Sequence, residues 1–230
     1  MARIILFDLN ETLLDPSVLD PHFERIFGVA AAREAWFKQT IESALVATIT
    51  NLYASFDSIQ RAALTMTAAQ HGLSLSEDEA RLILSRVRAL PPYPDVRPAL
   101  EYLQAEGFPL VVLTNSPTHA MTAQLEHAGL GDCFDRTLSV DAIRRFKPHA
   151  ETYQMVASRL GVRTAHLRLV SAHAWDIAGA LRAGCAAAFV ARPGQVLDPL
   201  MEEPDVIGNT LFAVARQIVE AESGVHAAQL

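Results

Sequence analysis

The chain begins MARIILFDLNETLLD, residues 1–15. The apolar, β-prone residues at its start predict a buried strand over 3–8. The strand delivers Asp8 and then breaks into the polar stretch Asn10–Thr12. An aspartate at such a point either caps the next turn or does chemistry. A carboxylate in a pocket has two main chemical uses, as a general base or as a nucleophile that forms an ester.

Size and composition favour an ordinary globular protein with a sizeable core. The 230 residues are 50% hydrophobic and 20% charged, with a formal net charge of -7. This acidity, without any Lys/Arg cluster, argues against binding to nucleic acid. The N-terminus lacks a basic segment followed by a long apolar stretch, so we expect no secretory signal, no membrane span and a cytoplasmic location. Cys133 and Cys185 are far apart and are expected to be small core residues.

From Pro21 to Val87 the pattern has helical periodicity with few strand signals. Ser76, with Glu79 three residues later, forms a capping box that opens the last helix of this region. Four helices are predicted, near 21–28, 31–52, 55–71 and 76–89.

The segment LPPYPDV, residues 90–96, stops this helical region because its three prolines cannot continue a helix. Strands and helices then alternate to residue 190, and the Ala-rich tail after Ala213 is helix-like. The predicted strands are 110–114, 136–139, 167–171 and 187–190, and the predicted helices are 98–106, 118–128, 150–160 and 175–183. Such alternation predicts an α/β fold with a parallel sheet and right-handed crossovers.

Ligands of such sheets bind beyond the carboxyl ends of the strands. This rule selects the polar segments Asp8–Thr12, Thr114–Ser116 and Ser171–Asp176, and the helical insert is placed where it can cover them. Lys147, in FKPHAETY, precedes a proline and the start of a helix. It is either a solvated surface lysine or a pocket ammonium that keeps Asp8 ionised and attracts an anion.

Taken together, these motifs resemble the haloacid dehalogenase superfamily. The resemblance rests on DLNETLLD at the first strand, VVLTN at the second, KP with Lys147 at the third and VSAHAWD at the fourth. It implies a Rossmann-like parallel-sheet core over residues 1–14 and 91–230, an inserted four-helix cap over 15–90, and Asp8 as the nucleophile.

Two departures separate the chain from the magnesium-dependent phosphatases of this superfamily. These enzymes carry a second aspartate two residues after the nucleophile as a general acid, and here that residue is Asn10. They also carry an acidic pair at the fourth strand to hold the metal, and here the pair is Ala172 and Asp176. Magnesium prefers carboxylate oxygens, so both departures point away from phosphoryl transfer.

The pattern is most similar to the L-2-haloacid dehalogenases, which use no metal. Ser171, His173 and Asp176 stand where that group has SxNxxD, and WFKQTIESAL resembles its first long cap helix. Thr114 and Asn115 stand at its Ser-Asn, and Lys147 with Tyr153 matches its lysine and tyrosine six residues apart. The implied reaction converts short 2-haloacids to 2-hydroxy acids: Asp8 displaces the halide to form an ester, which water hydrolyses.

The resemblance also implies a role for each site residue. Lys147 keeps Asp8 charged, while Ser171 and Asp176 fix the lysine and the hydrolytic water. Tyr153 orients the lysine region or lines the pocket. The substrate is expected to contact Asn10, Thr12, Phe37, Thr114 and Asn115. No cofactor or metal is implied, and a homodimer is plausible because cap helices commonly mediate dimers in this group.

Three positions depart from the dehalogenase pattern. Phe37 occupies the position of the arginine that receives the halide, and helical spacing places the nearby Lys38 about 100° around the axis from it. His173 replaces an asparagine, and it could donate to a halide, act as a base on water or fill space. Asn10 stands where the group often has an aromatic residue. Two alternatives therefore stay open: a magnesium-dependent phosphatase and a non-catalytic binding protein with the same fold.

Overall fold

A six-stranded parallel sheet forms the centre of the protein. The structure, a computed structural model, describes residues 3–227. The strand order in the sheet is β3-β2-β1-β4-β5-β6. The strands are β1 (Ile4–Phe7), β2 (Leu110–Thr114), β3 (Arg136–Ser139), β4 (Leu167–Ser171), β5 (Ala186–Val190) and β6 (Val206–Gly208). The predicted α/β fold with a parallel sheet is therefore confirmed.

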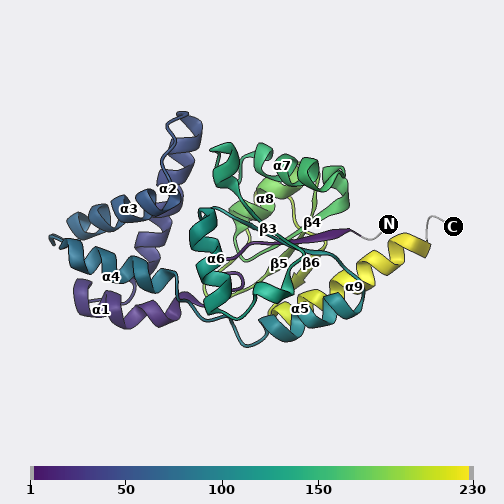
Figure 1. Ribbon diagram of the computed structural model, residues 1–230, viewed down its shortest axis with the longest axis horizontal. Helices are drawn as coiled ribbons and strands as arrows, with labels where there is room; N and C mark the ends of the chain where they lie inside the picture. The colour runs from purple at the N-terminus through teal and green to yellow at the C-terminus, as the bar shows by residue number, and fades with distance from the viewer. Residues whose placement is uncertain (1–2, 228–230) are drawn as a thin grey trace.

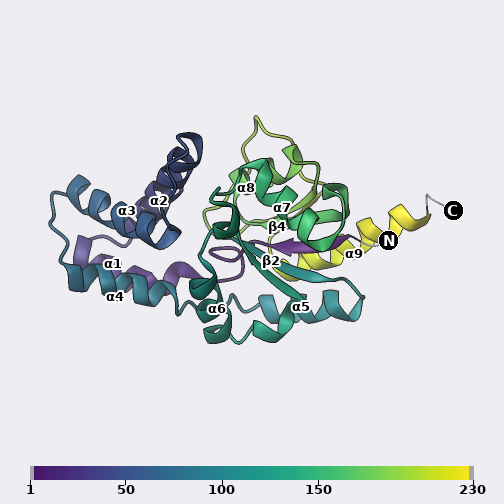
Figure 2. The same cartoon turned by 45° about the horizontal axis from the view of Figure 1, so that its top comes forward.

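Helices cover both faces of the sheet, which is why its strands are near-continuous apolar runs. One face packs against α5 (Val96–Ala105), α6 (Thr118–His127) and α9 (Leu211–Ala227). The other face packs against α7 (Ala150–Leu160) and α8 (Ala174–Arg182), as Figure 2 shows. Alternate residues of β1 serve the two faces, because Ile5 and Phe7 belong to the first core cluster and Leu6 to the second.

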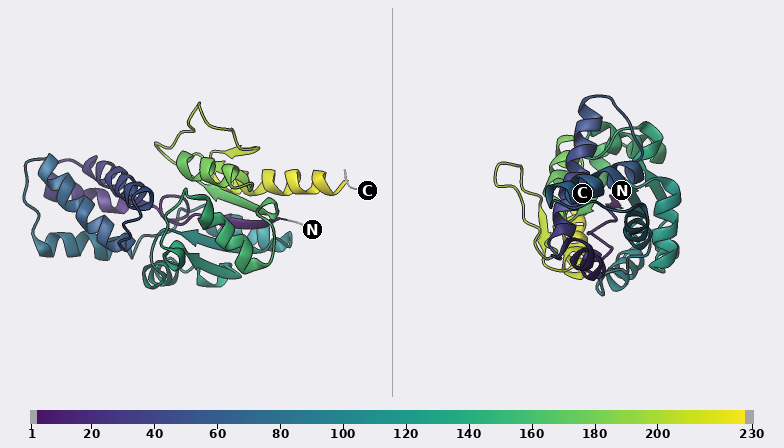
Figure 3. Two further views of the ribbon diagram at one scale, coloured as in Figure 1. Left: turned by 90° about the horizontal axis from the view of Figure 1, so that it is seen from above. Right: turned by 90° about the vertical axis from the view of Figure 1, so that its left-hand side faces the viewer.

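Four helices between β1 and α5 form a separate layer at the carboxyl end of the strands (Figures 1 and 3). These are α1 (Asp20–Phe27), α2 (Ala32–Ile49), α3 (Phe56–Gln70) and α4 (Glu77–Val87). They agree with the predicted helices to within a few residues. The capping box of Ser76 and Glu79 is present at the start of α4. We refer to residues 15–90 as the cap, and their division from the core stays a prediction.

Two connections join the cap to the core, and they run side by side. The Asp15 backbone N–H donates to Pro91 O over 2.8 Å, and the Tyr93 N–H donates to Leu13 O over 3.0 Å. Leu14 forms an isolated antiparallel bridge with Pro92. The buried side chains of Leu13 and Leu14 belong to a core cluster that runs from the sheet into the cap. The carboxyl end of β1 is thereby held against the base of the cap.

Cys133 and Cys185 are both free and buried, as expected. The edge strand β6 was not predicted, because three residues give too short a pattern to detect. Within residues 3–227, no helix has the length and apolar character needed to cross a membrane.

Candidate active site

The Asp8 carboxylate lies at the carboxyl end of β1 and each of its oxygens has a partner. The Thr12 hydroxyl donates to Oδ2 over 2.7 Å, and Lys147 Nζ donates to Oδ1 over 2.7 Å. The Thr12 oxygen in turn accepts from the backbone N–H of Ala172 over 3.0 Å. The segments that follow the carboxyl ends of β1 and β4 therefore fix the orientation of Asp8 together.

Lys147 is a buried ammonium whose three protons all have acceptors. Besides Asp8, Nζ donates to Asp176 Oδ2 over 2.7 Å and to the backbone oxygen of Leu113 over 3.1 Å. Its side chain has no exposed surface. The sequence left open whether Lys147 is a solvated surface lysine or a pocket ammonium. In the structure its ammonium lies in the site and not in solvent.

This cluster shifts the pKa values of all three groups. Burial alone would raise the pKa of Asp8, but the charges of Lys147 and then His173 outweigh it and lower that pKa below its ordinary value. Burial opposes the charge on Lys147, but Asp176 and Asp8 raise its pKa. Burial raises the pKa of Asp176. Asp8 is therefore the carboxylate that stays ionised beside an ammonium.

Asp176 lies in the first turn of α8, and it is held from a second side by Tyr153 of α7. The Tyr153 hydroxyl donates to Asp176 Oδ1 over 2.6 Å, and both side chains are fully buried. Gly179, one turn further along α8, permits this approach. A Cβ there would lie 2.4 Å from Pro148 Cβ and 2.7 Å from the Tyr153 hydroxyl. Tyr153 thus holds the Asp176 carboxylate in place from α7.

His173 precedes α8 and presents its Nε2 atom to Asp8. Nε2 lies 3.7 Å from Asp8 Oδ2 and 3.2 Å from the backbone oxygen of Asn10. The imidazole stacks between two rings, with centroid distances of 5.6 Å to Phe37 and 5.0 Å to Trp175. The stack fixes the plane of the ring and directs Nε2 towards Asp8.

Four other predicted residues make contacts that hold the surrounding loops. The Ser171 hydroxyl accepts from the backbone N–H of His173, and Asn115 Oδ1 accepts from the backbone N–H of Lys147. The Thr114 hydroxyl accepts from the backbone N–H of Ser116. Asn10 donates to the Ser116 hydroxyl and accepts from Gln124. The substrate and lysine contacts that the resemblance implies for these side chains stay predictions.

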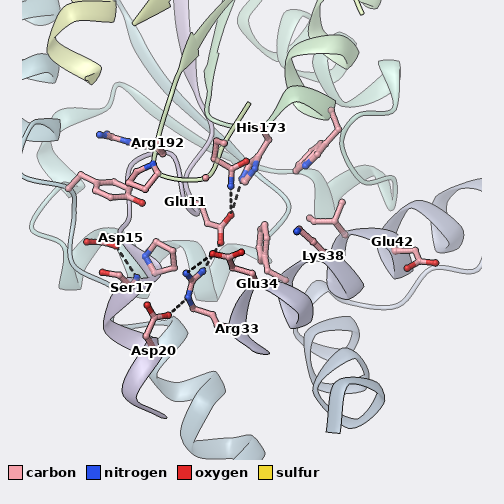
Figure 4. A pocket seen from close by; sticks show the side chains of 18 of the residues that line it. Glu11, Asp15, Ser17, Asp20, Arg33, Glu34, Lys38, Glu42, His173 and Arg192 are labelled. Carbon is pink, nitrogen blue, oxygen red and sulfur yellow. Dashed lines mark hydrogen bonds and ion pairs between the residues drawn. The ribbon is translucent and has the colours of Figure 1, made fainter. Parts of the chain in front are cut away.

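A cavity of about 700 Å³ opens between the cap and the core beside His173 (Figure 4). One wall is the face of α2 that carries Arg33, Glu34, Phe37, Lys38, Ile41, Glu42 and Leu45. The opposite wall includes His173, Trp175, Tyr93 and Arg192. Phe37 and Lys38 both line the cavity although about 100° separates them on the helix, because the wall spans a wide face of α2. Lys38 therefore contributes a positive charge here.

Glu11 occupies the middle of this region and was not predicted as a site residue. Figure 4 shows its carboxylate between His173 and Arg33. Its oxygens lie 3.3 Å from Arg33 Nη1, 3.4 Å from Gln195 Nε2 and 4.0 Å from His173 Nε2. Burial raises its pKa above the ordinary value, against the charges of His173 and Arg33. The partners of Glu11 come from α2, from the turn before α8 and from a loop near residue 195, so no local pattern could have identified it.

Arg192 is a second residue that the sequence analysis missed. Its Nε donates to Thr12 O over 3.0 Å, and its Nη1 donates to Asp95 over 2.9 Å. The guanidinium lies over the ring of Tyr93, 4.0 Å from its centroid. Arg192 follows β5 by two residues, and the rule that ligands lie beyond strand ends, extended to this strand, would have included it.

Comparison with known proteins places this geometry in a family. A family model described as haloacid dehalogenase-like hydrolase matches residues 2–184. The (S)-2-haloacid dehalogenase H-109 of Pseudomonas putida is 30% identical over 203 residues, covering 87% of this chain and 90% of that protein. The (S)-2-haloacid dehalogenase of Pseudomonas sp. (strain YL) is 30% identical over 222 residues, covering 96% of this chain and 95% of that protein.

A solved structure agrees in fold over almost the whole chain. The L-2-haloacid dehalogenase from Xanthobacter autotrophicus, with chloropropionic acid covalently bound, superposes with a TM-score of 0.88 at 27% identity, covering 95% of this chain and 98% of that one. The buried aspartate at the end of β1, the lysine that pairs with it and the helical layer above them thus occur in a chain that belongs to the haloacid dehalogenase-like hydrolase family.

Proposed function

We propose that this protein hydrolyses short 2-haloacids to 2-hydroxy acids through an ester on Asp8, without a metal ion. The observation that carries the proposal is the buried ammonium of Lys147, which lies 2.7 Å from Asp8 and 2.7 Å from Asp176. It keeps Asp8 ionised in a site with little water, and an ionised carboxylate is what a displacement at carbon requires. The names of the related proteins support the same substrate class.

Oδ2 is the attacking oxygen of Asp8 in this proposal. It faces His173, which lines the cavity, whereas Oδ1 is held by Lys147. Oδ2 bonds to the carbon that carries the halogen, and the electron pair of the carbon–halogen bond leaves with the halide. Thr12 and Lys147 hold the carboxylate in one orientation, which favours an in-line approach.

Cations on α2 serve the anionic parts of the substrate. Phe37 stands where the family resemblance leads us to expect an arginine, but Arg33 and Lys38 face the same cavity. Arg33 is paired with Asp20 and Glu11, whereas among residues 3–227 Lys38 makes no ion pair. Lys38 is therefore the proposed acceptor of the departing halide. His173 supplies an N–H beside Oδ2.

A magnesium-dependent phosphatase is disfavoured by the same ammonium. A divalent cation between Asp8 and Asp176 would have to displace Lys147 from two contacts of 2.7 Å. Asn10, at the position of the phosphatase acid, is engaged with Ser116 and Gln124. Asp8 and Asp176 thus serve the lysine, and a phosphatase reaction has no free carboxylate pair here.

The test measures halide release from chloro-, bromo- and fluoroacetate and from 2-chloropropionate, beside p-nitrophenyl phosphate with and without magnesium. The expected result is halide release that EDTA leaves unchanged, together with a hydroxy acid product. Asp8→Asn should release no halide. Phosphatase activity that depends on magnesium, without halide release, would refute the proposal, and so would halide release by a verified Asp8→Asn protein.

We also propose a cytoplasmic homodimer. Free, buried thiols at Cys133 and Cys185 are compatible with a reducing compartment. The C-terminal end of α2 exposes Val46, Ile49 and the following Leu52, with exposed fractions of 53%, 78% and 73%, which supports contact with a second copy. Light scattering should give a molar mass of twice that of the chain. In Ile49→Glu it should fall to the mass of a single chain.

A further inference from the structure

Hydrolysis of the proposed Asp8 ester needs a base to activate water, and Asp176 is already fully engaged. Its Oδ1 accepts from Tyr153 over 2.6 Å and its Oδ2 from Lys147 over 2.7 Å. The Asp176 side chain has no exposed surface. A carboxylate with both oxygens committed and no access to the cavity is poorly placed to take a proton from an entering water.

His173 does not fill this role through the nitrogen that faces the nucleophile. Nε2 lies 3.2 Å from the backbone oxygen of Asn10, which can only accept. Two further acceptors, Asp8 Oδ2 and Glu11 Oε2, lie 3.7 Å and 4.0 Å from the same nitrogen. An imidazole nitrogen among three acceptors carries a proton, so it donates and has no lone pair for water.

Glu11 is the carboxylate beside Asp8 that has capacity to spare. Its contacts to Arg33 and Gln195, at 3.3 Å and 3.4 Å, are longer than ordinary hydrogen bonds. Its side chain lines the cavity and is one tenth exposed. Asp8 Oδ2 and Glu11 Oε2 lie 3.7 Å and 4.0 Å from the same His173 nitrogen, so both carboxylates border one edge of the imidazole.

The backbone at Glu11 adds an independent sign of function. Its φ is +61°, in the left-handed region that a glycine adopts freely and a glutamate does not. A non-glycine residue is strained in that region, and such residues gather at functional sites. Burial also raises the pKa of Glu11, which makes it a stronger base than an exposed carboxylate.

From this geometry we propose that Glu11 is the general base for the second half of the reaction, taking a proton from the water that attacks the Asp8 ester. The inference rests on the proposed function. His173 lies beside Glu11, and its Nε2–H group orients the water and the ester oxygen. Arg33 and Gln195 hold Glu11 in place from the cap and from the core.

Hydrolysis of the ester forms one bond at Cγ of Asp8 and breaks another. The water oxygen bonds to Cγ of Asp8, and one water proton passes to Glu11. The bond between Cγ and Oδ2 then breaks, and Oδ2 leaves with the product carbon. The proton on Glu11 converts that alkoxide to the hydroxyl of the 2-hydroxy acid. The remaining water proton is lost to solvent, which restores the Asp8 carboxylate.

Glu11→Gln separates the two half-reactions, because it preserves shape and removes the base. After rapid mixing with 2-bromopropionate, we expect one equivalent of bromide per site at a rate within about threefold of the unaltered protein. Hydrolysis of the adduct should slow by roughly 10²–10⁴-fold. Intact-protein mass spectrometry should show the adduct accumulating on the peptide that contains Asp8.

Glu24→Gln is the matched control, since it removes the same charge from an exposed side chain of the cap that does not line the cavity. It should hydrolyse the adduct at the unaltered rate. Glu11→Gly suits the left-handed backbone and should accumulate the same adduct in a folded protein.

Three results would contradict the assignment of Glu11. The first is a Glu11→Gln protein that hydrolyses its adduct as fast as the unaltered protein. The second is an equal loss of bromide release and hydrolysis, which indicates a role in binding or closure. The third is an adduct that also accumulates in Glu24→Gln. An unaltered protein that releases no halide and forms no adduct would instead overturn the proposed function itself.

Discussion

At the residue scale, one ammonium decides the chemistry of the site. Lys147 holds two carboxylates that would otherwise repel each other in a buried space, and it lowers the pKa of one of them. The raised pKa of Asp176 and the lowered pKa of Asp8 give the two carboxylates different behaviour from nearly the same distance to the lysine. Environment, more than residue type, separates the nucleophile from its support.

Lys147→Met should show this coupling as a change in the pH dependence of stability. The pKa of Lys147 is raised above its ordinary value of 10.5 in the folded protein. The stability that the charged lysine contributes is therefore complete below pH 10.5, and it is lost as the pH rises through the pKa of the folded state. Urea unfolding should therefore show stability falling above pH 10.5 more steeply in the unaltered protein than in Lys147→Met. Near neutral pH the variant should lose about 3–5 kcal/mol, because two buried carboxylates lose their partner. Identical slopes above pH 10.5 would contradict the linkage.

His173→Ala should reduce kcat by roughly 10²-fold or more while the protein stays folded, because it removes the N–H beside Asp8 Oδ2. Steady-state halide release and a cooperative unfolding transition provide the two measurements. His119→Ala is a suitable control, since that imidazole is 65% exposed and contacts Asp57 in the cap. An unchanged kcat in His173→Ala would remove this residue from the mechanism.

The sequence was most informative where function lies within a short motif. Asp8 follows an apolar run, and Lys147 and Tyr153 are separated by a spacing that the family resemblance makes recognisable. Glu11 was not predicted as a site residue, because its position in the site depends on a left-handed backbone and on partners at residues 33, 173 and 195. The contacts of Thr114 and Asn115 with backbone N–H groups were not predicted either, since turn geometry decides which way a short polar side chain points.

At the element scale, the close approach of α8 to the lysine loop sets the distances of the site. Gly179 is the point of contact, and no other residue fits there without movement of Pro148 or Tyr153. The register of α8 then fixes both His173 before it and Asp176 in its first turn. Helix position is thus translated directly into the geometry around Asp8.

Gly179→Ala should lower the free energy of unfolding by about 1–3 kcal/mol and reduce kcat, because the new methyl group pushes α8 away from Pro148 and Tyr153. Chemical denaturation and halide release would measure the two effects. Gly131→Ala is the matched control, since an added Cβ there meets no atom within 4 Å. Equal stability of the two variants would contradict the packing argument.

Elements were predictable in proportion to their length and periodicity. The helices of the cap were identified from repeated apolar positions and from the capping box at Ser76. By contrast, β6 is three residues long and only its pairing with β5 makes it a strand. Its partner, not its own sequence, provides the information.

At the scale of the whole molecule, the cavity between cap and core defines what the protein admits. About 700 Å³ exceeds the space that a two- or three-carbon acid needs, and much of the wall is apolar, with Phe37, Ile41, Leu45 and Trp175. Short 2-haloacids therefore fit, and longer side chains at the second carbon have an apolar wall to contact.

Leu45→Trp should narrow this range. We expect the unaltered protein to turn over 2-bromohexanoate with a kcat/KM at least equal to that for 2-bromopropionate, since each buried methylene contributes about 0.8 kcal/mol of favourable transfer free energy. Leu45→Trp should lower the value for the longer acid by at least about tenfold and change the shorter one little. Ala35→Trp, at an exposed position of α2 that does not line the cavity, serves as the control. Equal effects on both acids would show that the cavity does not select by length.

The burial of both thiols acquires a meaning once the substrate class is considered. A 2-haloacid is itself an alkylating reagent. Cysteine reacts with it only in the thiolate form, because the thiolate is the nucleophile. Burial raises the pKa of Cys133, and burial together with Asp176 raises that of Cys185 to about 12. Both thiols are therefore protonated and buried at neutral pH, while the Asp8 carboxylate, the proposed nucleophile, is ionised. The fold thus protects its own chain from the reagent that it consumes.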